Sequence, residues 1–142
     1  KQVNNNQGSI SITFDDGYQN IFFNAIPILK KYNIPATIFI TTGYLGKKPG
    51  WIKNKKNENY FELLLSEEQL KMIPSDLITI GSHSITHPRL ADISEQKILL
   101  ELRESKKILE RMVEEKIFDY YEVVQFIWTF YRDGIDALPI SI

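Results

Sequence analysis

The chain has 142 residues, a net charge of −1 and no cysteine, and 43% of its residues are hydrophobic. The length predicts a single domain over residues 1–142, and the near-neutral charge gives no electrostatic reason to expect a nucleic-acid partner. The lack of cysteine excludes disulfides and thiolate metal sites, and no apolar run approaches the ~18 residues of a membrane span.

The first third of the chain predicts two strands with a helix between them. β-Branched residues alternate over about 9–14, apolar residues recur at helical spacing over 19–32, and a second buried strand is expected over 36–40. Pro27 lies inside the helical window, so we expect the helix to be kinked or restarted there and to stop at Asn33. A strand, a helix and a strand joined by short links form a βαβ unit, which implies parallel strands.

The remaining elements continue this alternation of strands and helices. In chain order we expect a folded excursion over 41–65, a short helix over 66–72 that starts with a capping box, a strand over 77–82, a long helix over 94–115 and a strand over 121–130. The apolar face of the long helix is predicted to hold Ile98, Leu99, Leu102, Ile108, Leu109 and Met112. The pattern predicts an α/β fold with a parallel sheet.

Two pairs of polar residues follow predicted strands. Asp15 and Asp16 follow the first strand, and His83 and His87, the only histidines of the chain, follow the third. If the strands are parallel, both pairs lie at the carboxyl edge of the sheet, where α/β proteins build their sites. One carboxylate and two imidazoles suit Zn²⁺ or a similar divalent ion, which leaves the other carboxylate to act as a base. Strand alternation shows only that the two aspartates differ, and leaves open which is the base.

Each of these features also has a simpler interpretation. An Asp-Gly pair at a strand end is common turn chemistry, and a His-x-x-x-His pair without further context is more often structural than metal-binding. Trp51 and Trp128 are most simply anchors of the core or of a loop. The placement of both polar pairs after strands is what favours a site.

Two motifs at this spacing resemble a known family. Thr-Phe-Asp-Asp-Gly at 13–17, followed by His-Ser-Ile-Thr-His at 83–87, resembles the polysaccharide deacetylase domain (NodB homology, carbohydrate esterase family 4). The resemblance extends from about Ser9 to Glu110. It implies a distorted (β/α) barrel, which we expect to be incomplete because three or four parallel strands do not close.

The same resemblance implies roles for the clustered residues. Asp15 would be the general base, and Asp16, His83 and His87 would hold one divalent metal ion, with zinc favoured over cobalt or nickel. The implied activity is a metal-dependent hydrolase that removes acetyl groups from an N-acetylated polysaccharide. A metal-bound water would attack the amide carbonyl while Asp15 takes its proton.

The resemblance also suggests a substrate and its contacts. Gly-Tyr at 17–18 is similar to the exopolysaccharide enzymes, which favours poly-N-acetylglucosamine over a chitin-like glycan. Thr42, Trp51, Trp128 and Phe130 are the candidate substrate-binding residues. The family implies an extracytoplasmic location, whether secreted, periplasmic or at the cell surface.

The last part of the chain departs from the family pattern. Where the third motif is expected, Thr129 replaces the proline and Phe130 replaces the tyrosine, and no third histidine exists to act as general acid. We therefore expect a truncated or divergent domain that binds metal, turns over slowly and forms a homo-oligomer through an open sheet edge. Two alternatives stay open: a catalytically inactive glycan-binding module on this scaffold, and a metal-free structural domain.

Overall fold

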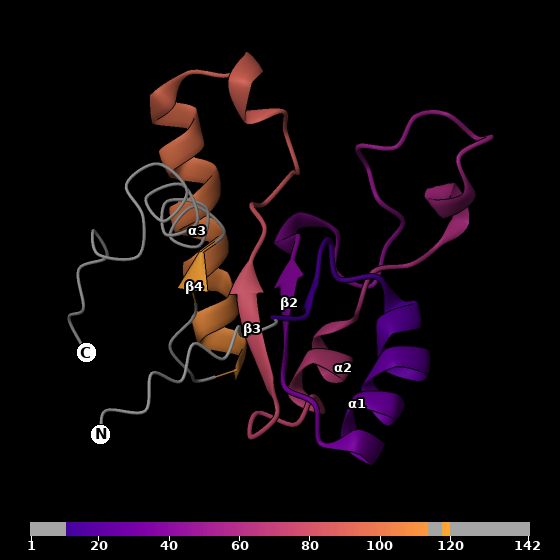
Figure 1. The fold of residues 1–142 in the computed structure, drawn as a ribbon. Coiled ribbons are helices and arrows are strands. Elements are labelled where there is room, and N and C mark those ends of the chain that lie inside the picture. The colour runs from indigo at the N-terminus through magenta and orange to yellow at the C-terminus, as the bar shows by residue number, and fades with distance from the viewer. Residues whose placement is uncertain (1–10, 114–117, 120–142) are drawn as a thin grey trace, which may run out of the picture.

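The computed structural model describes residues 11–113 and 118–119, and the account below refers to these residues. They contain four parallel strands in the order β1-β2-β3-β4, of which β2, β3 and β4 are labelled in Figure 1. The strands are β1 (Thr13–Phe14), β2 (Ala36–Ile40), β3 (Ile78–Ser82) and β4 (Phe118–Asp119). The parallel sheet, with helices between successive strands, confirms the predicted α/β class.

The strand register places two loops at one edge of the sheet. β2 and β3 pair from Ala36 beside Ile78 to Ile40 beside Ser82, and Phe14 of β1 lies beside Ile38. Because all three strands run in the same direction, the segments that follow β1 and β3 leave the sheet at the same, carboxyl edge. The predicted meeting of the two polar pairs at this edge is confirmed.

The first helical segment changes its hydrogen bonding at Pro27, as predicted. A π-helical turn, η1 (Ile21–Ala25), leads into α1 (Ile26–Tyr32), which has the proline in its first turn. Proline has no N–H to donate and is tolerated at a helix start, so the helix restarts there. Asn33 ends α1 in the left-handed conformation, at a φ of 52°.

The other helices connect the later strands. They are η2 (Thr42–Tyr44), η3 (Glu58–Phe61), α2 (Glu67–Lys71), η4 (Leu90–Asp92) and α3 (Glu95–Val113). The predicted capping box begins α2: the Ser66 hydroxyl accepts from the Gln69 N–H at 3.2 Å, and the Gln69 side chain accepts from the Ser66 N–H at 2.9 Å. The predicted excursion over 41–65 is folded, since it contains η2 and η3.

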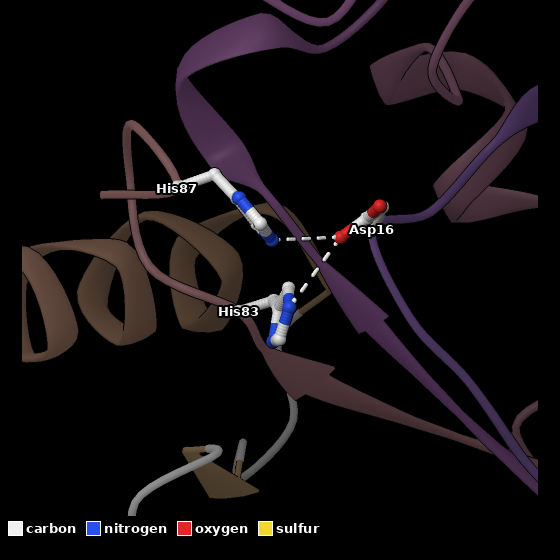
Figure 2. Close-up of side chains that lie close together, drawn as sticks. All are labelled: Asp16, His83 and His87. Atoms are coloured by element: carbon white, nitrogen blue, oxygen red, sulfur yellow. Dashed lines mark ion pairs between the residues drawn. The ribbon is translucent and has the colours of Figure 1, made fainter. Parts of the chain in front are cut away.

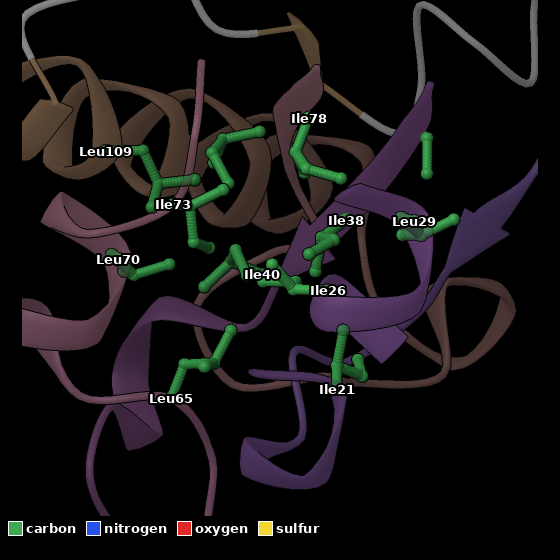
Figure 3. Close-up of a cluster of buried hydrophobic side chains, with 12 residues drawn as sticks. Ile21, Ile26, Leu29, Ile38, Ile40, Leu65, Leu70, Ile73, Ile78 and Leu109 are labelled. Carbon is green, nitrogen blue, oxygen red and sulfur yellow. The ribbon is translucent and has the colours of Figure 1, made fainter. Parts of the chain in front are cut away.

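The hydrophobic core lies between one face of the sheet and the helices (Figure 3). Side chains two residues apart on a strand share a face, so the isoleucines of β2 and β3 point together toward α1, α2 and α3. The fully buried members of this core include Ile38, Ile40, Leu65, Leu70, Ile78 and Leu109. This packing fixes the sheet edge on which the polar loops stand.

One detail of the predicted long helix differs from the structure. Leu99, which the helical pattern placed on the apolar face of α3, is 40% exposed, whereas Glu101, Leu102, Ser105 and Leu109 are buried. The face of α3 that packs inward includes the polar residues Glu101 and Ser105, so the apolar spacing alone wrongly placed Leu99 on it. The predicted strand over 121–130 lies outside the described residues, and β4 begins earlier, at Phe118. No helix in the described part of the chain is long and apolar enough to cross a membrane.

Candidate metal centre

Asp16 stands in a tight turn at the end of β1. Asp16 and Gly17 both have left-handed backbones, with φ of 68° and 78°. The positive φ favours glycine at position 17, and a Cβ there would also lie 2.7 Å from the Cδ1 of Ile40 and displace it. The Leu65 N–H donates to the Gly17 carbonyl at 2.8 Å, which fastens the turn to the core.

The two histidines come from a loop that leaves β3. The His83 N–H donates to the Ile40 carbonyl at 2.9 Å, which extends the pairing of β2 and β3 by one residue. Ser84 and His87 both have left-handed backbones, with φ of 67° and 55°. The His87 N–H donates to the Ser84 hydroxyl at 3.1 Å, which closes the loop into a tight turn. The tight turn folds the chain back, so both imidazoles lie on the same side.

The side chains of Asp16, His83 and His87 converge on one point, as Figure 2 shows. The Asp16 Oδ1 lies 3.1 Å from Nε2 of His87 and 3.4 Å from Nε2 of His83, and all three ligand atoms lie within 4.8 Å of one another. Zinc bonds of about 2.0–2.2 Å at tetrahedral angles put ligand atoms roughly 3.4 Å apart. The spacing and the donor types therefore fit a divalent cation.

Asp15 occupies a different environment from Asp16. Its side chain is exposed, whereas the Asp16 side chain is 19% exposed and lies against both imidazoles. The Asp15 charge still reaches the cluster, because it adds to the rise in the pKa of His87 and opposes part of the fall that burial causes in the pKa of His83. One carboxylate thus faces the histidines, and its neighbour stands beside them in solvent.

Tyr18 adds a phenol beside Asp16. Burial, followed by the charge of Asp16, raises the pKa of Tyr18 to about 12. The phenol therefore stays protonated at neutral pH and can donate a hydrogen bond. From the sequence, Tyr18 was noted only as part of the Gly-Tyr pair at 17–18, and no role in the site was predicted for it.

Trp51 reaches the cluster from the long loop between β2 and α2. Its ring stacks on the His87 imidazole, with centroids 4.5 Å apart and planes 23° from parallel. Tyr44 packs edge-to-face against Trp51, with the two ring centroids 5.5 Å apart. Gly50 makes the packing feasible, because a Cβ there would overlap the Tyr44 ring. The structure thus places the predicted Trp51 at the site.

The other candidate substrate residues are placed differently. Thr42 is buried, and its hydroxyl donates to the Ser105 hydroxyl at 3.1 Å, which favours a structural role over a substrate contact. Its role in substrate binding stays a prediction. Trp128 and Phe130 lie outside the described residues.

The two histidines are expected to titrate on opposite sides of about 6.5 in the metal-free protein. Burial, with the neighbouring His87, lowers the pKa of His83, whereas the hydrogen bond to Asp16 raises the pKa of His87. NMR titration of the imidazole signals measures both values, and because the chain has two histidines, one substitution assigns both. A common titration near 6.5 would contradict the asymmetry. Since metal ions bind unprotonated imidazole, metal affinity should fall as His87 gains its proton.

Comparison with known proteins shows which family the chain belongs to. The sequence pattern of the polysaccharide deacetylase family matches residues 2–122. YxkH of Bacillus subtilis is 35% identical over 107 residues, which are 75% of this chain and 33% of that protein. The poly-β-1,6-N-acetyl-D-glucosamine N-deacetylase of Staphylococcus aureus is 36% identical over 115 residues, which are 72% of this chain and 36% of that enzyme. The chain thus spans about a third of the length of these relatives.

A solved structure shares the fold. The Streptococcus pyogenes deacetylase PplD, in complex with acetate, superposes with a TM-score of 0.61 at 24% identity. The match covers 78% of this chain and 44% of that protein. The described sheet accordingly corresponds to part of the distorted barrel found in the solved structures that it resembles. The chain belongs to the polysaccharide deacetylase family.

Proposed function

We propose that this domain removes acetyl groups from an N-acetylated polysaccharide with the help of one divalent cation. The observation that carries the proposal is the convergence of Asp16, His83 and His87 at the carboxyl edge of the sheet. One carboxylate oxygen and two imidazole nitrogens form the ligand set of many catalytic zinc sites. Zinc is the favoured ion, and cobalt or nickel would suit the same ligands.

The reaction is the hydrolysis of an amide. The bound ion supplies a Lewis acid that polarises the acetyl carbonyl and makes water easier to deprotonate. Asp15, exposed beside the cluster, takes the proton of the attacking water. The water oxygen bonds to the carbonyl carbon, and the carbon–nitrogen bond breaks as the leaving nitrogen takes up the proton that Asp15 held. The products are acetate and a free amine on the sugar.

Poly-N-acetylglucosamine is the favoured substrate. The Staphylococcus aureus relative is named for this polymer, and its match covers most of the present chain. Trp51 offers a partly exposed flat ring beside His87, where a sugar ring can stack. A surface polysaccharide as substrate places the reaction outside the cytoplasm.

Replacement of Trp51 by alanine is expected to raise the KM for chito-oligosaccharides by roughly 2- to 10-fold, the value of one aromatic contact. Trp51→Phe should retain most of the affinity, because it keeps a flat ring against His87. Steady-state kinetics of both variants measure the effect. A loss confined to kcat would contradict substrate stacking and indicate that the indole acts only on His87.

Acetate release tests the proposed function directly. The chain is loaded with Zn²⁺ or Co²⁺, its metal content is measured, and acetate is assayed with poly-N-acetylglucosamine and with chito-oligosaccharides. We expect release that stops with a chelator and returns with added metal. Full metal occupancy without acetate release would refute the activity. Glycan binding without release would favour the glycan-binding alternative on the same fold.

A further inference from the structure

One helix holds the loop that carries both histidines. Glu101 of α3 is 6% exposed, and its carboxylate accepts three hydrogen bonds from this loop. The donors are the Ile85 N–H at 2.9 Å, the Thr86 N–H at 2.8 Å and the Thr86 hydroxyl at 2.6 Å. Ile85 and Thr86 lie between the two histidines in sequence, so the carboxylate holds the middle of the loop.

Ser105, one helical turn after Glu101, makes a second attachment. It is fully buried, and its hydroxyl donates to the Ser84 carbonyl at 2.9 Å. The same oxygen accepts from the hydroxyls of Ser82 at 2.8 Å and Thr42 at 3.1 Å. This one side chain therefore joins the end of β3, the start of the histidine loop and the segment after β2.

The histidine loop needs such support because its backbone is strained. Ser84 and His87 adopt left-handed conformations that non-glycine residues take only at an energetic cost. A strained loop keeps its shape only where surrounding contacts enforce it. Hydrogen bonds to an ionised acceptor are the stronger kind, and Glu101 provides them to two successive backbone N–H groups.

We propose that Glu101 and Ser105 are positioning residues of the metal centre. Their hydrogen bonds reach the backbone of Ser84, Ile85 and Thr86 and the Thr86 hydroxyl. They fix the backbone from Ser84 to Thr86, and so set the directions from which His83 and His87 approach Asp16. This inference rests on the proposed metal site, and it means that α3 contributes to the affinity of that site for its metal.

The test measures Co²⁺ binding to the full chain by calorimetry and by the visible spectrum of the bound ion. Glu101→Ala and Ser105→Ala are each expected to weaken Co²⁺ binding by about 10- to 100-fold, the usual effect of losing a residue that orients metal ligands. Glu101→Gln should regain part of the affinity, because its amide oxygen still accepts from the loop. The spectrum of the bound ion should shift in the alanine variants as the ligand geometry loosens.

Leu109→Ala is the matched control. Leu109 lies on the same helix and is fully buried, but it packs in the hydrophobic core. This variant should lower the melting temperature and leave Co²⁺ affinity unchanged. The proposal is overturned if the alanine variants bind Co²⁺ like the wild type, or if affinity simply follows melting temperature through all the variants. A wild-type chain that binds no Co²⁺ would refute the metal site itself, and the positioning role with it.

Discussion

Replacement of Asp16 by asparagine is expected to weaken Zn²⁺ binding by more than about 100-fold. This loss is larger than the usual effect of replacing a residue that only orients the metal ligands. Asp16 is the anionic member of the cluster, and its Oδ1 lies within 3.4 Å of both imidazoles. Asparagine keeps the size of the side chain and also tolerates the left-handed φ of 68° at this position. The substitution therefore removes the charge with little change of backbone.

Calorimetry with Zn²⁺ or Co²⁺, together with metal analysis of the purified variant, measures the loss. Asp15→Asn is the matched control, because it removes the neighbouring charge and keeps all three proposed ligands. Wild-type metal affinity in Asp16→Asn would show that the cluster does not use this carboxylate, and the proposed ligand set would have to be abandoned.

The second large effect is expected from Asp15. Asp15→Asn should bind metal like the wild type and release acetate about 10²- to 10⁴-fold more slowly, because a general base contributes an acceleration of this size. The side chain is exposed beside the cluster, so its replacement should not disturb the core.

The measurement is the rate of acetate release per bound metal ion, so that a change in occupancy cannot imitate a change in chemistry. Asp76→Asn, which removes the same charge at an exposed position before β3, controls for altered surface charge. Undiminished release by Asp15→Asn would assign the base to another group.

The parts of the fold that follow from local patterns were predicted from the sequence. Alternating β-branched residues located β1, β2 and β3, the restart at Pro27 followed from the missing N–H, and the capping box located α2. The meeting of the aspartate pair with the two histidines followed from parallel strand direction, whereas the choice of Asp16 as the ligand came from the family resemblance. These features depend on periodicity and on turn chemistry, which short segments carry by themselves.

The supports of the site were not predicted, because they depend on contacts between distant segments. Glu101 lay in a helix that the family resemblance covered, but it was given no role, and only tertiary packing turns it inward against Thr86. The sequence did offer one signal for its burial: Glu101 lies next to Leu102, on the side of the helix that also carries Leu109. The stacking of Trp51 on His87 joins residues 36 positions apart and follows from no local spacing.

The attachment of the histidine loop to α3 has a consequence for local unfolding. The Ile85 and Thr86 amides are covered by a helix residue, and the same helix packs Leu109 into the core. These amides can exchange with solvent only when the loop breaks away from Glu101 or when α3 leaves the sheet. Exchange of these two amides therefore reports on opening of the histidine loop, either by itself or together with α3.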